Sequence, residues 1–135
     1  MARSILVDTG FIVALLSRRD RHHRWATMQA RRHSPPWHTC ESVLSEAFHL
    51  LGRAGQPALS GLLRLGAVVP ALDLGSELEP ILILLRKYAN VPMSLADACL
   101  VRMTETLADP LLLTTDSDFR VYRRHSRQVV PSAMP

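Results

Sequence analysis

Two carboxylates follow two short apolar segments that lie far apart in the chain. Asp8 comes directly after "SILV" and Asp116 comes after "LLLTT", and both segments have the composition of buried strands. Ligands bind at the carboxyl ends of the strands in an open parallel sheet, so such a sheet would hold both acids at one edge. Aspartate is also a common turn and capping residue, which is the simpler explanation for either acid alone.

Two further acids lie on segments with helical spacing. Asp97 follows Ser94 by three residues, a capping-box pattern in which the helix dipole favours an acid in the first turn. Glu46 lies beside the apolar face of a predicted helix, near Leu50, and Glu41 borders the other side of that face. Helical phase alone does not choose between Glu46 and Glu41.

These acids together favour a metal site. Two carboxylates about 4 Å apart repel each other by about 1 to 4 kcal/mol, and a cluster raises its own pKa values unless a cation neutralises it. Carboxylate oxygens are hard ligands that suit Mg²⁺ or Mn²⁺. Such ions activate water and stabilise the leaving oxygen when a phosphodiester is hydrolysed.

Basic residues flank this acidic centre in the sequence. The chain of 135 residues has a formal net charge of +4, and Lys87 is the one lysine among sixteen lysine and arginine residues. Residues 18–33 hold six arginines, and residues 120–127 hold four directly after the acidic segment. A polyanionic substrate is therefore expected. The predicted phosphate contacts are Arg120, Arg123 and Arg124.

Aromatic and imidazole side chains are further candidates for substrate contact. Trp25, Trp37 and Tyr122 can stack on bases, although core packing is the better explanation for Trp37. His22 and His23 lie in the first basic segment, where exposure to solvent is the simplest interpretation.

Strand and helix patterns alternate along the chain. The predicted strands and extended segments are 4–8, 34–39, 67–74 with a break at Pro70, 110–116 and 127–131. The predicted helices are 9–19, 20–33, 40–55, 57–66, 76–90 and 94–109. The aliphatic run in 76–90 could be a strand, but its length and acidic start favour a buried helix.

This alternation predicts an α/β sandwich with a parallel sheet, in one domain over residues 1–135. Cys40 and Cys99 match no disulfide framework or metal motif, so both are expected as buried thiols in a reducing compartment. No apolar run approaches the ~20 residues of a membrane span, and the N-terminus makes a poor signal peptide. A cytoplasmic protein without membrane contact is the expectation.

Four segments together resemble the PIN domain family, and within it the VapC-like toxin ribonucleases of type II toxin–antitoxin systems. They are, in the family's order, "ILVDTGFIVALL", "CESVLSEAFHLL", "PMSLADACLVRMTE" and "LLLTTDSDFRVYRR". With the helices between them they span nearly the whole chain. The resemblance implies a PIN-like three-layer sandwich, in which helices flank a twisted, mainly parallel sheet of four to five strands.

The resemblance also implies an active site. It implies an endoribonuclease that depends on Mg²⁺ or Mn²⁺, hydrolyses RNA and leaves a 5′-phosphate and a 3′-hydroxyl. The acids that match the family's catalytic positions are Asp8, Glu46, Asp97 and Asp116, of which the three aspartates would chiefly hold metal. The match selects Glu46 over Glu41, because the family's second acid lies midway along that helix.

Further residues match supporting positions of the family. Asp118 matches an additional acid two residues after the fourth, which binds a metal ion or shapes the turn. Thr9 and Thr115 match small hydroxyl residues that orient a water or a ligand. The resemblance implies partners as well, because these toxins commonly form homodimers and are neutralised by a small antitoxin protein that covers the site.

Other functions fit the sequence less well. Within the fold, the alternatives are a PIN-domain nuclease that is not a toxin and a catalytically silent RNA-binding PIN-like module, and retention of all four acids speaks against the silent module. A haloacid-dehalogenase-like phosphatase would need an acid two residues after Asp8, where the chain has Gly10. A phosphorylatable receiver would need a late lysine, whereas Lys87 precedes the last acidic segment.

Overall fold

A parallel sheet forms the centre of the protein. The computed structural model describes residues 2–135 and orders the strands β3–β2–β1–β4–β7, with every neighbouring pair parallel. This five-stranded sheet confirms the predicted α/β class. The strands are β1 (Ser4–Val7), β2 (Trp37–Thr39), β3 (Val68–Pro70), β4 (Pro110–Leu113) and β7 (Ser132–Ala133).

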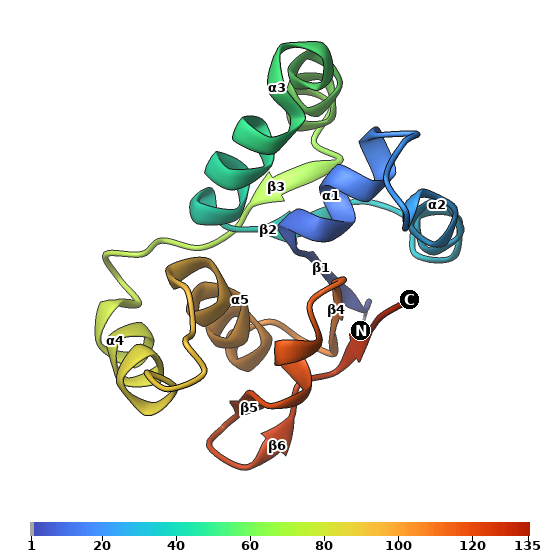
Figure 1. Cartoon of the computed structure of the whole chain (residues 1–135). Coiled ribbons are helices and arrows are strands. Elements are labelled where there is room, and N and C mark those ends of the chain that lie inside the picture. The colour runs from blue at the N-terminus through green and yellow to red at the C-terminus, as the bar shows by residue number, and fades with distance from the viewer. Residues whose placement is uncertain (1) are drawn as a thin grey trace.

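Helices cover both faces of this sheet, as Figure 1 shows. α1 and α2 lie on one face and α4 and α5 on the other, and α3 packs against α1 and also reaches α5. This arrangement confirms the predicted three-layer sandwich. That residues 1–135 form one domain stays a prediction, and Met1 lies outside the described residues. The helices are α1 (Thr9–Leu16), α2 (His23–Arg32), α3 (Glu41–Arg64), α4 (Leu78–Lys87) and α5 (Leu95–Thr106).

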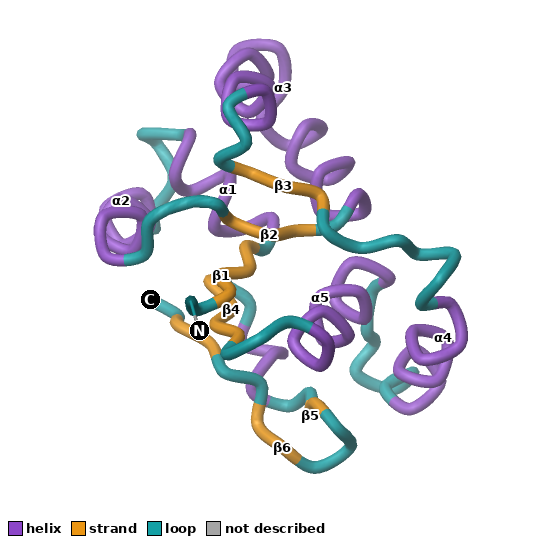
Figure 2. The backbone as a smooth tube through the Cα atoms, turned by 180° about the vertical axis from the view of Figure 1, so that it is seen from behind, coloured by secondary structure: helices purple, strands orange, loops and turns teal. Residues whose placement is uncertain are grey.

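β1 lies in the middle of the sheet, between β2 and β4 (Figure 2). Leu6 and Val7 are fully buried, which is why β1 is a continuous apolar run rather than an alternating one. Val7 pairs with Leu113, and these two are the last residues of their strands. The chain therefore leaves β1 and β4 at the same level, at the edge where the acids follow.

α3 bends sharply at Gly52. This residue has a φ of 63° and a ψ of −168°, a backbone conformation that is open to glycine and interrupts the helix. The predicted helices 40–55 and 57–66 therefore form one bent helix, whose break lies at Gly52 and not at the predicted boundary at residue 56. The second arm turns away from the direction of the first, which shapes the surface beside α1.

The end of the chain differs from the prediction of a strand over 127–131. β6 (Gln128–Val129) pairs antiparallel with β5 (Arg123–Arg124) in a separate hairpin, and β7 takes the place beside β4 in the main sheet (Figure 2). The predicted strand 110–116 also ends earlier, at Leu113, because the chain turns there into a 3-10 helix over Ser117–Arg120.

The burial of α4 differs from the prediction as well. The aliphatic run was expected to make a buried helix, and Ile81 and Leu84 are indeed buried. Leu82 and Ile83, however, are 42% and 57% exposed, because α4 packs against α5 with one face only. Among the helices of residues 2–135, none is both long and apolar enough to cross a membrane.

Both cysteines are buried and free, as the sequence predicts. Cys40 is the residue that precedes α3, and Cys99 lies on α5. A hydrogen bond that the Cys40 thiol donates to Cys99 and burial raise the pKa of Cys40, so Cys40 is an unreactive thiol at neutral pH.

Gly10→Ala is expected to destabilise the protein by about 1 to 2 kcal/mol. A Cβ at Gly10 would overlap Thr115 Oγ1 and lie 3.2 Å from Thr115 Cβ, so the segment after β4 would have to move away from α1. Urea denaturation measures the loss. The matched control is Gly61→Ala in α3, where an added Cβ meets no atom within 4 Å and alanine should stabilise by about 0.5 to 1 kcal/mol. Equal stability of Gly10→Ala and wild type would contradict the close contact.

Candidate active site

The pairing of β1 with β4 decides where the first acid lies. The backbone N–H of Asp8 continues the ladder of the two strands by donating to the Leu113 carbonyl at 3.1 Å. The residue after Leu113 is Thr114, so its hydroxyl lies beside the Asp8 carboxylate although the two residues are 106 positions apart. The parallel register thus joins Asp8 to the segment that leads to Asp116.

Both carboxylate oxygens of Asp8 are held by the protein. Oδ1 accepts a hydrogen bond from the Thr9 N–H at 2.7 Å, which makes Asp8 the N-cap of α1, and Oδ2 accepts from the Thr114 hydroxyl at 2.7 Å. The Thr114 oxygen in turn accepts from the Asp116 N–H at 3.0 Å. These bonds orient Asp8 and tie it to the loop that carries Asp116.

Asp97 is positioned by the first turn of α5 and by Tyr122. Ser94 Oγ accepts from the Asp97 N–H at 3.0 Å, and Asp97 Oδ2 accepts from the Ser94 N–H at 3.3 Å, so the predicted capping box is present. The buried Tyr122 hydroxyl donates to the same Asp97 oxygen at 2.9 Å. Burial and this hydrogen bond raise the pKa of Tyr122, so Tyr122 remains a neutral donor.

Asp116 caps the 3-10 helix that follows β4, because its Oδ1 accepts from the Asp118 N–H at 2.9 Å. Asp8, Asp97 and Asp116 therefore all lie at the N-terminal ends of helical segments. The partial positive charge of a helix N-terminus stabilises a carboxylate. The same three aspartates cap helical segments and belong to one site, so their capping role does not exclude a functional role.

One cavity of about 530 Å³ brings the predicted acids together. Glu46 lines this cavity from α3, one turn before Leu50, which lines it too, whereas Glu41 is not in its lining. The structure thus decides between the two glutamates that helical phase leaves open. The acids in the lining are Asp8, Glu46, Asp97, Asp116 and Asp118.

Burial raises the pKa values of two of these acids. Burial is the largest influence on Asp8 and raises its pKa from the ordinary 3.8 to about 6, although the hydrogen bonds to its carboxylate lower it. The negative charges of Asp97 and Asp116 raise the pKa of Asp8 as well. Burial also raises the pKa of Asp97, and the hydrogen bond from Tyr122 lowers it. Charged Asp8 and Asp97 are therefore unfavourable in this cavity without a cation.

No ion pair offsets this cost within residues 2–135. None of the five carboxylates forms an ion pair with a Lys, Arg or His side chain of the described chain. The exposed Arg21 and the half-buried His22 belong to the same cavity lining. An acid cavity without a paired counter-charge is a place where a bound cation would be strongly favoured.

The carboxylates do not converge on one point as they lie. Over residues 2–135, no group of three or more His, Cys, Asp and Glu side chains is placed so that it could hold a metal ion. The hydrogen bonds of the helix caps hold each aspartate to its own segment. The donor set still fits a hard cation, because Asp97 Oδ1 and Asp116 Oδ2 accept no hydrogen bond from the described residues. Binding an ion would require rotation of these side chains toward one another.

Comparison with known proteins identifies the family. The PIN domain family matches residues 5–124, which include all five acids, β1 from Ile5 onward and the whole of β4. The chain belongs to the PIN domain family. PIN domains are generally nucleases and generally act with divalent metal ions, so the match indicates a nuclease. No curated protein matches the chain.

Thr9 and Thr115 both line the acid cavity, and their predicted role of orienting a water or a ligand stays a prediction. The Thr9 hydroxyl donates to the Val43 carbonyl at 3.5 Å, so Thr9 contacts an acid through its backbone N–H alone. Thr115 lines the cavity beside Gly10, but the hydroxyl that bonds Asp8 belongs to Thr114. The sequence does not predict the role of Thr114, because Thr114 and Thr115 both carry a hydroxyl group. Only the register of β4 against β1 shows which of the two contacts Asp8.

The exposed Arg120 stays a predicted phosphate contact, whereas Arg123 and Arg124 bond the protein's own backbone. Arg120, Arg123 and Arg124 are not among the residues that line the acid cavity. Arg123 donates to the backbone carbonyls of residues 120–122, and Arg124 donates to the Thr104 carbonyl. These two guanidinium groups hold the hairpin in place, so the fold already uses them. Arg21, between α1 and α2, is the arginine that lines the cavity.

The aromatic side chains are packing residues. Trp37 and Tyr122 are buried, which confirms packing for Trp37 and excludes base stacking by Tyr122. Trp25 and Trp37 pack edge-to-face against Phe11, with ring centroids 6.1 and 5.6 Å apart. Tyr122 contributes to the site through its hydroxyl group instead.

Asp8→Asn is expected to stabilise the PIN domain in EDTA at about pH 7.5 by about 1 to 3 kcal/mol. A folded-state pKa of about 6 lies above the ordinary 3.8, so protonated Asp8 contributes stability at low pH that is lost as the pH rises through about 6. The gain from Asp8→Asn should therefore be small near pH 4 and full above pH 6. Urea denaturation of both proteins across this range measures it.

The exposed Asp73 supplies the matched control. Hydrogen bonds from Ser76 lower the pKa of Asp73, so Asp73→Asn should not gain stability as the pH rises. A gain from Asp8→Asn that is independent of pH would contradict the assignment of the buried charge to Asp8.

Proposed function

We propose that this PIN domain is a ribonuclease that hydrolyses RNA phosphodiester bonds with Mg²⁺ or Mn²⁺. The observation that carries the proposal is the cavity at the carboxyl ends of β1 and β4, which five carboxylates line without a counter-charge paired to them among residues 2–135. A chain with a net charge of +4 around an acidic cavity suits a polyanionic substrate. The four segments that resemble VapC-like ribonucleases support RNA as that substrate.

Three aspartates would hold the ion. Asp97 and Asp116 each have a carboxylate oxygen without a hydrogen bond from the described residues, and the buried Asp8 lines the same cavity. Asp118 lines the same cavity and is proposed as an additional contact. When bound, a divalent ion acidifies a water molecule and offsets the negative charge that develops on the phosphoryl oxygens.

Glu46 is the acid best placed to accept a proton. The three aspartates are engaged in helix caps, whereas the exposed Glu46 carboxylate accepts no hydrogen bond within residues 2–135. We propose that Glu46 accepts a proton from the attacking water. The water oxygen bonds to phosphorus as the bond from phosphorus to the 3′ oxygen breaks. The 3′ oxygen takes up a proton from solvent, which leaves a 5′-phosphate and a 3′-hydroxyl.

Other residues of the chain keep the acids in place. Thr114 and the Thr9 N–H orient Asp8, and Tyr122 orients Asp97 through a hydrogen bond of 2.9 Å. Arg21 and His22 line the same cavity and are proposed to contact the phosphates of the strand.

Purified protein is expected to cut single-stranded RNA with Mg²⁺ or Mn²⁺ and to lose this activity in EDTA. Asp97→Asn should lower the cleavage rate about 100-fold or more, because it removes a negatively charged ligand. Glu46→Gln should lower the rate at least about tenfold at saturating metal, because it removes the proton acceptor. Gel analysis of a labelled RNA with mass spectrometry of the products measures rate and end groups.

Glu41→Gln is the matched control on the same helix. Glu41 does not line the cavity, so this variant should cleave within about twofold of wild type, well below the effect expected of a proton acceptor. Full activity in EDTA, or in Asp97→Asn after its fold has been verified by circular dichroism, would contradict a metal-dependent nuclease. Equal effects of Glu41→Gln and Glu46→Gln would remove the assigned role of Glu46.

We further propose that the protein acts as the toxin of a toxin–antitoxin pair, as a homodimer that a small antitoxin protein neutralises by covering the acid cavity. The resemblance to VapC-like toxins supports this role.

Expression of the chain alone in a bacterial host is expected to arrest growth, because unrestrained RNA cleavage stops protein synthesis. The toxin role further predicts that a small protein is encoded beside the gene, that its co-expression restores growth, and that sedimentation shows both the dimer and the complex. Asp97→Asn is the control and should not arrest growth. An active nuclease whose expression leaves growth unchanged would contradict the toxin role and favour a PIN-domain nuclease of another kind.

A further inference from the structure

A second cavity lies next to the acid cavity, in a groove between α1 and α3. It has a volume of about 320 Å³ and shares Val13 and Leu50 with the lining of the acid cavity. Because both residues line both cavities, the two cavities adjoin each other at these side chains. A linear polymer with a phosphodiester in the acid cavity can therefore continue into the groove.

The bend of α3 provides one side of this groove. Leu50 and Leu51 come from the arm before Gly52, and Ala54 and Gly55 come from the arm after it. Ala54 has a small side chain and Gly55 has none, so these two residues leave the groove open. Its floor is apolar, so the groove can accept the flat face of a nucleobase without reading a particular base.

Two arginines at the end of α1 give the groove its charge. Arg18 and Arg19 line it and are exposed. In the part of the chain that the structure describes, neither side chain forms an ion pair or donates a hydrogen bond. This distinguishes them from Arg102, which pairs with Glu77 at 2.7 Å, and from Arg124, which is bound to a backbone carbonyl.

We propose that the groove between α1 and α3 holds a nucleotide of single-stranded RNA next to the one in the acid cavity, with Arg18 and Arg19 on the phosphates and the apolar floor under the base. This inference rests on the proposed ribonuclease function and adds a second nucleotide site beside the acid cavity. An apolar groove with free cations on its rim complements an RNA strand, which alternates bases with phosphates. A duplex would keep its bases paired and away from the apolar floor.

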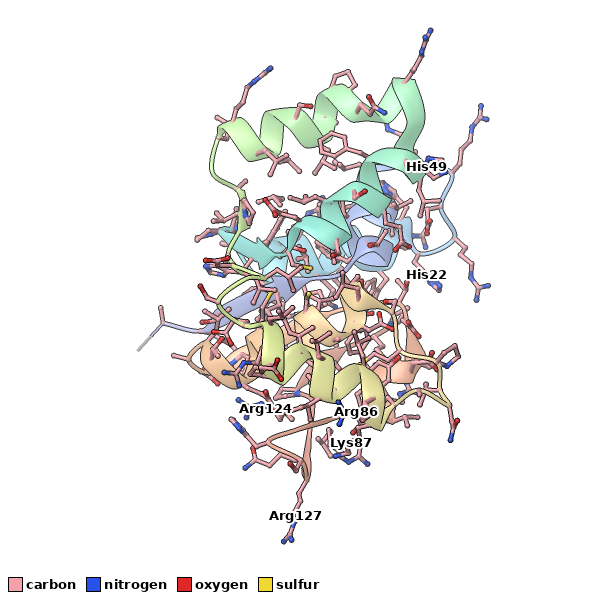
Figure 3. All side chains as sticks on the ribbon, turned by 90° about the vertical axis from the view of Figure 1, so that its left-hand side faces the viewer. His22, His49, Arg86, Lys87, Arg124 and Arg127 are labelled. Atoms are coloured by element: carbon pink, nitrogen blue, oxygen red, sulfur yellow. The ribbon has the colours of Figure 1, made fainter. Side chains whose placement is uncertain are left out.

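The other basic cluster of the molecule provides the control. Figure 3 shows Arg86, Lys87, Arg124 and Arg127 together at one end of the molecule, away from His22 and His49. Arg86 and Arg127 are exposed and line neither cavity. Arg86→Glu/Arg127→Glu therefore makes the same change in net charge as Arg18→Glu/Arg19→Glu at a site that the strand is not expected to reach.

The test measures the affinity for a fluorescein-labelled 12-nucleotide single-stranded RNA by anisotropy. Wild type and both double variants are compared in EDTA, and again with Mg²⁺ in the Asp97→Asn background, with gels to verify intact RNA. Arg18→Glu/Arg19→Glu should raise Kd about tenfold or more and lower the slope of log Kd against log salt by about 1.4, or about 0.7 for each phosphate that an arginine no longer neutralises. Arg86→Glu/Arg127→Glu should change Kd about threefold or less, as expected of screened distant charges.

Ala54→Trp tests the floor of the groove without a change in charge. Filling the groove should raise Kd at least about fivefold, because a base can no longer stack there, and should leave the salt slope unchanged. The thermal melts of all variants verify the fold, and a duplex of the same sequence should bind more weakly than the single strand.

Three results would overturn the inference. They are equal effects of the two arginine double variants on Kd, wild-type affinity of a folded Ala54→Trp, and equal affinity for duplex and single-stranded RNA. Any of these results would indicate that another ligand, such as an apolar peptide, occupies the groove. Failure of the nuclease proposal can be told apart from failure of the groove proposal. A wild-type protein that never cleaves RNA would contradict the nuclease, while the binding data in EDTA would still show whether the RNA strand occupies the groove.

Discussion

The parallel pairing of β1 with β4 is the contact on which the site depends. It ends both strands at the same level, so that Asp8 donates to the Leu113 carbonyl and meets the Thr114 hydroxyl. A shift of one residue in this pairing would turn every β4 side chain to the other face of the sheet and break the link to Asp116. Burial of both strands on both faces makes such a shift costly. The apolar core thus fixes the position of a polar site that lies outside it.

The helix caps reduce the electrostatic cost of holding several acids in one cavity. Each aspartate of the site belongs to the N-terminal end of a helical segment, where backbone N–H groups and the helix dipole offset part of its charge. The compensation is incomplete, since the pKa of Asp8 is still raised to about 6. The cavity therefore retains electrostatic repulsion that a cation would relieve. Sites of this kind lower the stability of the empty protein in favour of binding.

Two sets of arginines in the chain have different roles, which the net charge does not distinguish. Arg102 and Arg124 are bound to a glutamate and to a backbone carbonyl, so they stabilise the fold. Arg18, Arg19 and Arg21 lie around the two neighbouring cavities and are exposed. This second set is placed to meet a substrate that enters these cavities. A basic composition is therefore informative about partners once the internal contacts of each arginine are known.

The sequence by itself determined the α/β class, the order of its elements and the acids that end or cap them. These features are local, since an apolar run predicts a buried strand and Ser-x-x-Asp predicts the start of the helix with Asp97. Only the tertiary structure decided that Glu46 rather than Glu41 lines the cavity, and that Thr114 holds Asp8. Those choices depend on strand register and helix packing between segments far apart in the chain. Such contacts leave no periodic pattern in the segment that makes them.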